Sequence, residues 1–145
     1  MDFAQADAVN RAIRLIGMKH RGRAGAALAA LGLHPGQEVF LLELDAHGAR
    51  TQTQLAAGLG CEPPSVTLMA QKLEAAGLVV RRGAPSDGRL TVVELTEEGR
   101  ALVVRLKEIW RRLAETTVAG LEFTSLERLR EVLDDLAHSL HGAKQ

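Results

Sequence analysis

Residues 51–95 read TQTQLAAGLGCEPPSVTLMAQKLEAAGLVVRRGAPSDGRLTVVEL, and the order of patterns in this stretch decides the fold. Thr51 followed three residues later by Gln54 is a capping box, and the apolar residues behind it predict a very short helix that stops at Gly60. Proline is tolerated in the first turn of a helix, where a backbone N–H has no helical partner. The pair Pro63-Pro64 therefore predicts the start of a second helix, over residues 63–76.

The hydrophobic period then changes from helical to alternating. Residues 78–82 and 90–95 are rich in β-branched side chains, and residues 83–88 between them are dense in turn formers, which predicts a β-hairpin. Its tip, Asp87-Gly88-Arg89, has two interpretations. It is either an ordinary polar turn, in which Gly88 takes a positive φ and both charges are solvated, or the wing of a winged helix. Its position directly after two helices joined by a tight turn favours the wing.

Two helices are predicted before this stretch. Apolar residues recur at helical spacing from Phe3 into an Ala-rich run that is closed by Gly32. A short helix follows, with Pro35 in its first turn and Gly48 as its stop.

Two more helices are predicted after the hairpin. Thr96 caps the first, with acidic residues in its first turn where the helix dipole favours carboxylates. Thr124 and Glu127 form a capping box that opens the second. Both helices carry a leucine-rich stripe at heptad-like spacing, which requires a partner helix. We interpret this stripe as a dimer interface made of Leu102, Leu106, Ile109, Leu126, Leu129, Leu133, Leu136 and Leu140.

The composition is that of an ordinary globular protein. The 145 residues make about one domain, and a content of 46% hydrophobic and 25% charged residues excludes a disordered chain and a disulfide scaffold. The single Cys61 cannot form an internal disulfide, and the sequence has neither a membrane-length apolar stretch nor a signal-peptide pattern. We therefore expect a cytoplasmic protein without membrane contact. Because the formal net charge is zero, any argument for nucleic acid must be local.

Together these patterns predict a mainly α protein with a small β-hairpin, in a single domain over residues 1–145. Residues 35–97 would form a winged helix-turn-helix lobe, and residues 1–34 and 98–145 the helices of a dimerisation domain. The expected core of the lobe is Leu55, Leu59, Val66, Ala70, Leu73, Leu78 and Val80. The helix over residues 63–76 would lie in a major groove of DNA. The candidate DNA contacts are then Pro64, Ser65, Thr67, Leu68, Gln71, Lys72, Arg82 and Arg89.

The chain resembles the MarR family of bacterial transcription regulators. The resemblance rests on Leu55-Ala56, the run from Leu73 to Arg82, Asp87-Gly88-Arg89 and the run from Leu95 to Arg100, and the flanking helices match the order in that family. It implies a homodimer that binds a palindromic double-stranded operator, most often as a repressor. It also implies that Arg89 enters the minor groove and that Asp87 braces the wing through an ion pair.

The resemblance further implies a small-molecule effector, aromatic or anionic, that lowers DNA affinity. A ligand between the dimer helices and the lobe would change the separation of the two recognition helices and so misplace their groove contacts. The candidate cleft residues, placed on the first two helices, are Lys19, Arg23, His34, Gln37 and Phe40.

Other functions find less support in the sequence. It contains no nucleophile elbow, no HExxH motif, no P-loop and no dinucleotide fingerprint after a strand, so we expect neither an enzyme nor a cofactor. His138 and His141 share a helix face, but no Cys/His motif with zinc spacing is present, so no metal is expected. The carboxylate of Glu62 beside Cys61 disfavours a reactive thiolate. A winged-helix protein-interaction module and a metal- or redox-responsive regulator stay open as alternatives.

Overall fold

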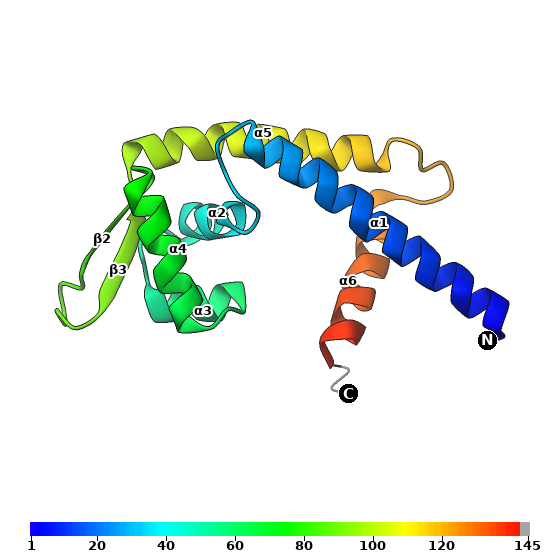
Figure 1. The fold of residues 1–145 in the computed structure, drawn as a ribbon, viewed down its shortest axis with the longest axis horizontal. Coiled ribbons are helices and arrows are strands. Elements are labelled where there is room, and N and C mark those ends of the chain that lie inside the picture. Colours follow the sequence, from blue (N-terminus) through cyan, green and yellow to red (C-terminus); the bar gives the residue numbers. More distant parts are fainter. Residues whose placement is uncertain (143–145) are drawn as a thin grey trace. The chain divides into compact units, whose positions relative to one another are not determined.

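The computed structural model describes residues 1–142, which contain six helices and a three-stranded sheet (Figure 1). The predicted fold class, mainly α with a small β-hairpin, is confirmed. Along the chain the elements are α1 (Phe3–Ala29), α2 (Gln37–His47), β1 (Arg50–Thr51), α3 (Gln52–Leu59), α4 (Pro63–Ala75), β2 (Val79–Gly83), β3 (Thr91–Leu95), α5 (Glu97–Val118) and α6 (Leu126–Gly142). The chain divides into two compact units, residues 1–114 and the residues from 115 onward.

Most helix boundaries follow the local signals in the sequence. Thr51 caps α3 in the predicted capping box, because its hydroxyl accepts the N–H of Gln54 at 3.1 Å and the Gln54 side chain accepts the N–H of Thr51 at 3.0 Å. The three predicted glycine stops and the glycine behind α4 have a positive φ, the conformation that glycine adopts without steric cost. These stops are Gly32, Gly48, Gly60 and Gly77.

The start of α2 differs from the prediction. Pro35 lies outside the helix, which begins at Gln37 after Gly36. The Gln37 side chain accepts the N–H of His34 at 2.9 Å, and the Glu38 side chain accepts the N–H of Gly36 at 2.7 Å. Two buried polar side chains of the first turn thus hold the backbone in front of the helix, and no side chain caps the start of α2 itself.

The start of α6 also differs, by one residue. The Ser125 hydroxyl accepts the N–H of Arg128 at 3.2 Å, whereas the Thr124 hydroxyl donates to the carbonyl of Ser125. Ser125 is therefore the capping residue, and the predicted capping box of Thr124 and Glu127 is wrong. The two hydroxyl residues are adjacent, and the path of the loop selects the one that meets the free N–H groups.

The three strands form one antiparallel sheet in the order β1-β3-β2. Val79 pairs with Leu95, and both are buried. Because side chains alternate across a strand, Val80 points outward and is 38% exposed, so its prediction as a core residue is wrong. Strand β1 has only two residues and no periodicity that the sequence could show.

The hydrophobic core of the first unit lies among α2, α3, α4, the sheet and the first half of α5. The predicted core residues Leu55, Val66, Ala70 and Leu73 are buried in it, and Leu59 and Leu78 pack against it half-buried. Leu106 is fully buried in the same core. Its prediction as a dimer contact is therefore wrong, because that face of α5 covers its own lobe.

None of the helices in residues 1–142 combines the length and the apolar character that a membrane crossing requires.

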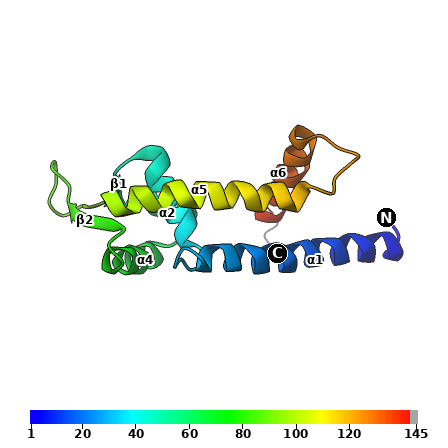
Figure 2. The same ribbon diagram turned by 90° about the horizontal axis from the view of Figure 1, so that it is seen from above.

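Close backbone packing joins the start of α5 to the start of the hairpin. The Thr96 N–H donates to the carbonyl of Leu78 at 3.0 Å, and the Thr96 hydroxyl donates to the carbonyl of Gly77 at 2.6 Å while accepting the N–H of Gly99 at 3.0 Å. A side chain on Gly99 would overlap the carbonyl oxygen of Leu78. Figure 2 shows the result, with α5 leaving directly from the base of the hairpin.

We expect the substitution Gly99→Ala to lower the free energy of unfolding by about 2–3 kcal/mol, the upper part of the range for overpacking, because a rigid backbone carbonyl must move. The matched control is Gly22→Ala in the middle of α1, where an added methyl group meets nothing within 4 Å. It should raise the stability by about 0.5–1 kcal/mol. Urea unfolding at one protein concentration measures both, and a Gly99→Ala protein as stable as the parent would contradict this account of the joint.

Candidate nucleic-acid interface

Helix α4 has one buried and one exposed face. Val66, Ala70 and Leu73 recur at spacings of four and three and lie in the core. The opposite face is therefore turned to solvent. It carries five of the predicted DNA contacts, all exposed: Pro64, Ser65, Leu68, Gln71 and Lys72.

Thr67 behaves differently from its neighbours on α4. It is half-buried, and its hydroxyl lies 3.2 Å from the carbonyl of Pro63 and 3.4 Å from Oε1 of Gln52, and its single hydrogen can be donated to either acceptor. Gln52, at the start of α3, is a residue that the sequence did not single out, and its contact with Thr67 ties α3 to α4. The Thr67 hydroxyl is thus turned toward its own chain and not outward with the other predicted contacts.

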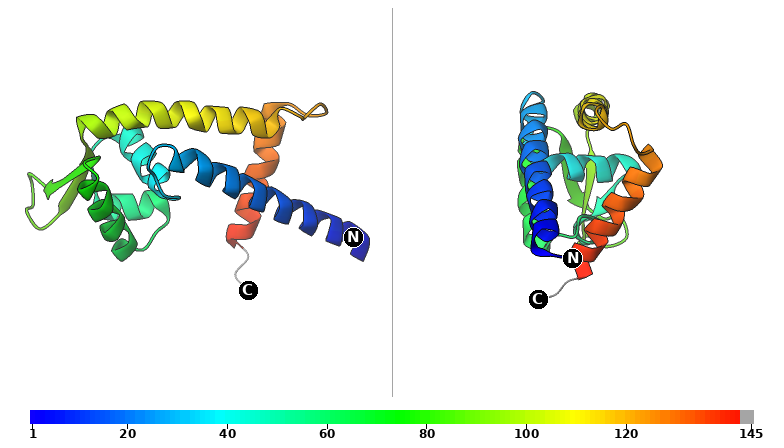
Figure 3. Two further views of the ribbon diagram at one scale, coloured as in Figure 1. Left: turned by 45° about the horizontal axis from the view of Figure 1, so that its top comes forward. Right: turned by 90° about the vertical axis from the view of Figure 1, so that its right-hand side faces the viewer.

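The wing is a compact loop at the end of the hairpin, reaching away from the helices (Figure 3, left). Its backbone closes through the N–H of Ala84, which donates to the carbonyl of Leu90 at 2.8 Å, and the N–H of Leu90, which donates to the carbonyl of Asp87 at 3.1 Å. Gly88 does not take the positive φ of the turn interpretation. Arg89, at the tip, is exposed.

Asp87 braces this loop in a way that differs from the expectation. Its carboxylate accepts the backbone N–H of Arg89 at 3.0 Å. Among residues 1–142 it forms no ion pair, so the expected ion-pair brace is corrected to a hydrogen bond within the turn. The brace holds the backbone of Arg89 and leaves its guanidinium free to point outward.

Two other ion pairs hold the wing. Glu74, near the end of α4, accepts the backbone N–H of Arg81 at 2.8 Å and two guanidinium bonds from the same residue at 3.1 and 3.0 Å. The backbone N–H of Arg81, followed by its guanidinium, holds the pKa of Glu74 below its usual value. Arg82 pairs with Glu94 on the neighbouring strand at 2.7 Å. The Arg81–Glu74 pair ties the wing to α4, and the Arg82–Glu94 pair ties β2 to β3.

These pairs leave an uneven distribution of charge on the lobe. Residues 51–95 contain four basic side chains, and Arg81 and Arg82 are both neutralised by pairing. Lys72 and Arg89 form no ion pair with any residue of the described chain, 1–142. The two cations without an ion pair therefore lie on the outward face of α4 and at the wing tip, where Glu62, directly before α4, and Asp87, near Arg89, are exposed acidic residues.

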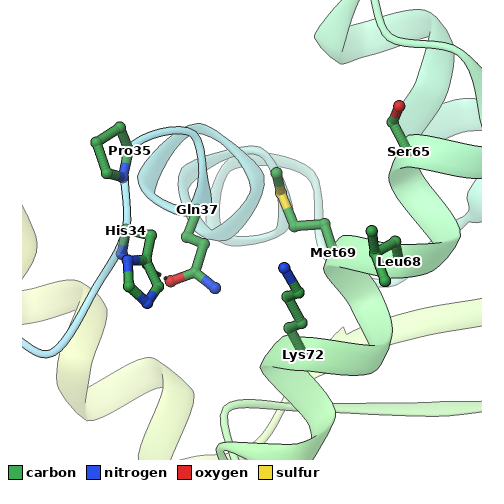
Figure 4. Close-up of a pocket in the computed structure, with 7 residues that line it drawn as sticks. All are labelled: His34, Pro35, Gln37, Ser65, Leu68, Met69 and Lys72. Carbon is green, nitrogen blue, oxygen red and sulfur yellow. Dashed lines mark hydrogen bonds between the residues drawn. The ribbon is translucent and has the colours of Figure 1, made fainter.

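The predicted effector residues do not form one cleft. Phe40 is fully buried in the core, so its assignment to a cleft is wrong. His34 and Gln37 line a pocket of about 280 Å³ together with residues of α4 (Figure 4). Lys19 and Arg23 are exposed on α1.

A second hollow of about 340 Å³ lies beside α1. Its wall includes His20 and Arg21. Their side chains leave the helix in directions different from those of Lys19 and Arg23, the two residues of α1 that were predicted for the cleft. Glu38 and Trp110 line its other side. The rotation of α1 about its own axis decides which basic side chains face the hollow. The sequence did not establish this rotation, because the helix is rich in Gly and Ala.

Two helices keep exposed apolar faces. On α1 the large exposed apolar residues are Phe3, Val9, Ile13, Leu15, Ile16 and Met18, and on α6 they are Leu126, Val132, Leu133, Leu136 and Leu140. Helix α6 has no buried residue at all. Of the other predicted dimer residues, Leu102, Ile109 and Leu129 are half-buried.

The histidines and the cysteine form no recognisable metal or redox centre. His138 and His141 line a shallow hollow on α6 with Asp134, but among the described residues no three His, Cys, Asp or Glu side chains lie together as metal ligands would. Cys61 is exposed, and its sulfur lies 3.6 Å from the carbonyl of Leu59.

The Glu74 carboxylate should make wing stability depend on pH. Its pKa is lowered in the folded protein, so its contribution is fully present above the unfolded-state value and is lost as the pH falls through the folded-state value. Glu74→Gln should therefore destabilise the protein at neutral pH, and its deficit relative to the parent should shrink in acid. Urea unfolding of the parent and the variant from pH 7 to pH 3 measures this. A Glu74→Gln deficit that does not change with pH would contradict the assigned ion pair.

The comparisons with known proteins agree with this geometry. Residues 33–91 match the family model described as "MarR family". The chain is 26% identical to a MarR-family transcriptional regulator from Rhodococcus sp. RHA1, with 94% of this chain and 96% of that one covered and a TM-score of 0.78. It is 28% identical to the transcriptional repressor CouR bound to a 23-mer DNA duplex, with 96% of each chain covered and a TM-score of 0.78.

CouR from Rhodococcus jostii RHA1 bound to p-coumaroyl-CoA is similar as well, at 27% identity, with 94% of this chain and 96% of that one covered and a TM-score of 0.77. The segment that matches the family model contains α2, α3, α4, β2 and the wing, which are the elements that carry the exposed recognition face and the two unpaired cations. Residues 33–91 are therefore a MarR-family domain, in a chain that has the fold of MarR-family transcriptional regulators along nearly its whole length.

Proposed function

We propose that this protein is a transcriptional regulator, acting as a repressor, that binds double-stranded DNA sequence-specifically through α4 and the wing. The observation that carries the proposal is the placement of Lys72 and Arg89. Both are basic side chains of residues 51–95 that form no ion pair with any residue in 1–142, and they lie on the two elements that a winged helix presents to DNA. The transcriptional repressor CouR, which shares this fold, is bound to a 23-mer DNA duplex in its structure, and this supports duplex DNA as the partner.

The exposed face of α4 has the chemistry for reading bases. The Gln71 amide can bond adenine in the major groove, the Ser65 hydroxyl can serve either as donor or as acceptor, and Leu68, 53% exposed, suits a thymine methyl group. Lys72 contacts a phosphate, and Arg89 enters the minor groove. Arg82 reaches a phosphate only by sharing its guanidinium with Glu94.

The proposed active form is a homodimer on a palindrome, with residues 1–34 and 98–145 as its dimerisation helices. Soluble monomers rarely expose contiguous apolar patches as large as the helical faces of α1 and α6. A twofold dimer would place two α4 helices in successive major grooves, about 34–36 Å apart. A partner protomer of the same chain would cover the exposed apolar faces and would supply the second lobe for a palindromic operator.

A small-molecule effector that lowers DNA affinity belongs to the same proposal. CouR bound to p-coumaroyl-CoA shows that a relative of this fold takes an organic ligand. The pocket lined by His34 and Gln37 is a candidate binding site for such an effector in this protein.

A winged-helix module for protein interaction is the second candidate. The neutral net charge and the exposed Leu68 favour it. Salt dependence separates the two, because duplex binding weakens steeply as salt rises and an apolar protein interface does not.

The DNA-binding proposal predicts different losses for two variants. Arg89→Ala should weaken binding to every duplex and reduce the salt slope by about one, because it removes one phosphate-neutralising charge. Gln71→Ala should cost about 1–3 kcal/mol, mainly at one base position. Fluorescence anisotropy at two salt concentrations measures both, with a duplex from the region upstream of the gene and a scrambled duplex as competitor. Equal, sequence-independent losses for the two variants would contradict base reading by Gln71, and no binding at low salt would favour the protein-interaction module.

The homodimer predicts that a charge on the apolar face of α6 separates the protomers. Leu133→Arg should shift the protein from dimer to monomer in analytical ultracentrifugation. Val39→Arg, on a 48% exposed position of α2 outside the proposed dimerisation helices, is the control and should leave the dimer intact. A parent protein that sediments as a monomer over the whole concentration range would contradict the proposed assembly.

A further inference from the structure

A pocket of about 280 Å³ opens on one flank of α4, and the start of α2 forms its opposite wall (Figure 4). Ser65, Met69 and Lys72 recur at spacings of four and three, so they line the pocket along one side of the helix. Leu68 lies beside them. Because Ser65, Leu68 and Lys72 are also proposed DNA contacts, the pocket borders the surface of α4 that meets DNA.

The width of the major groove indicates what this flank of α4 meets. An α-helix is about 10–12 Å across and the major groove of B-DNA is about 12 Å wide, so a helix in the groove extends from one wall to the other. Those walls are the sugar-phosphate backbones. A pocket on the side of α4 therefore faces phosphates, whereas the residues at the front of the helix face base edges.

Gln37 supplies a hydrogen-bond donor of fixed orientation to this pocket. It is 9% exposed, and its Oε1 accepts the backbone N–H of His34 at 2.9 Å, which leaves Nε2 as the free end of the amide. Nε2 has no acceptor within residues 1–142. In the described chain the one fully buried side-chain polar atom without a partner is Nε2 of Gln52, so Nε2 of Gln37 still reaches solvent. It is available to an acceptor from outside the chain.

Lys72 adds a positive charge to the same pocket. Its ammonium group extends toward the Gln37 amide in Figure 4, and no residue in 1–142 forms an ion pair with it. No acidic side chain lines the pocket, and Pro35 and Met69 supply apolar surface beside the two donors. An amide donor and an ammonium group next to apolar surface match the two non-bridging oxygens of a phosphate and the sugar attached to it.

We propose that this pocket holds one backbone phosphate of the bound duplex, with Gln37 Nε2 and Lys72 Nζ each donating to a non-bridging oxygen. The inference rests on the proposed DNA-binding function and concerns the DNA-bound form. It adds to the DNA contacts a residue of α2, outside the helix-turn-helix pair and the wing. A neutral donor has a recognisable effect, because it strengthens binding to every duplex but releases no counterion and so adds nothing to the salt slope.

Fluorescence anisotropy at two salt concentrations, on the upstream duplex and on the scrambled duplex, tests this assignment. Gln37→Leu should weaken binding to both duplexes about tenfold, the effect of one hydrogen bond to a charged group, and should leave the salt slope unchanged. Lys72→Gln should weaken both and also reduce the slope by about one. A Gln37→Leu protein that binds both duplexes as tightly as the parent does would overturn the assignment.

Gln37→Glu separates the donor from the bond to His34. Its carboxylate keeps an oxygen for the His34 N–H but replaces Nε2 by a second oxygen, so it should bind DNA more weakly than Gln37→Leu does. The matched control is Gln5→Glu, whose side chain likewise accepts a backbone N–H three residues earlier, that of Asp2 at 3.0 Å. Gln5 lies at the end of α1 away from α4 (Figures 1 and 2), and this control should leave DNA binding unchanged. Equal losses for the two Glu variants would reveal a general effect of charge and overturn the contact.

Neutral methylphosphonate linkages, placed one at a time along the upstream duplex, locate the phosphate. At one position the substitution should weaken binding of the parent and have a smaller effect on both Gln37→Leu and Lys72→Gln, because each variant has already lost a contact to that phosphate. If the two variants are coupled to different phosphates, or to none, the shared site is wrong.

Free inorganic phosphate is the other source of the same chemistry. Met69 lines the pocket, so a ¹³C label on its methyl group reports occupancy, and Met69→Leu identifies its signal. The duplex should shift this signal, whereas inorganic phosphate should not when compared with chloride at equal ionic strength. Saturable binding of free phosphate would assign the pocket to a soluble anion and overturn the proposal. Failure of the parent to bind any duplex would instead refute the proposed function, whereas failure of the phosphate contact alone leaves duplex binding intact.

Discussion

The contact between Gly99 and the carbonyl of Leu78 is the constraint on which the rest of the lobe depends. Because no side chain intervenes, the first turn of α5 can pack directly on the chain segment that enters the hairpin, where Thr96 joins the two by hydrogen bonds. From this point α5 runs across the lobe and places Val103 and Leu106 in the core. The hairpin, α4 and α5 thus meet at this contact, and a bulkier residue at position 99 would disturb all three.

Ion pairing separates the basic side chains of residues 51–95 into a paired group and an unpaired group. Arg81 and Arg82 are paired with Glu74 and Glu94 and hold the wing to α4 and to its own partner strand. Lys72 and Arg89 are left to interact with something outside the described chain. Within residues 51–95, Glu74 and Glu94 thus neutralise the arginines that hold the wing, whereas Lys72 and Arg89 keep their charges in a chain with no net charge.

The sequence by itself determined the local features of this protein. The capping box at Thr51, the glycine stops, the two prolines that open α4 and the alternation of the hairpin are short-range signals, each set by backbone geometry within a few residues. They were sufficient for the element order, the exposed face of α4 and the winged fold. Only the tertiary structure decided that Val80 points outward, that Phe40 and Leu106 belong to the core, and that Thr67 turns toward Gln52. It also decided which arginines are neutralised. Packing brings Arg81 to Glu74, 7 residues away in the chain, and Arg82 to Glu94, 12 residues away, and no periodic pattern in the sequence predicts these two ion pairs.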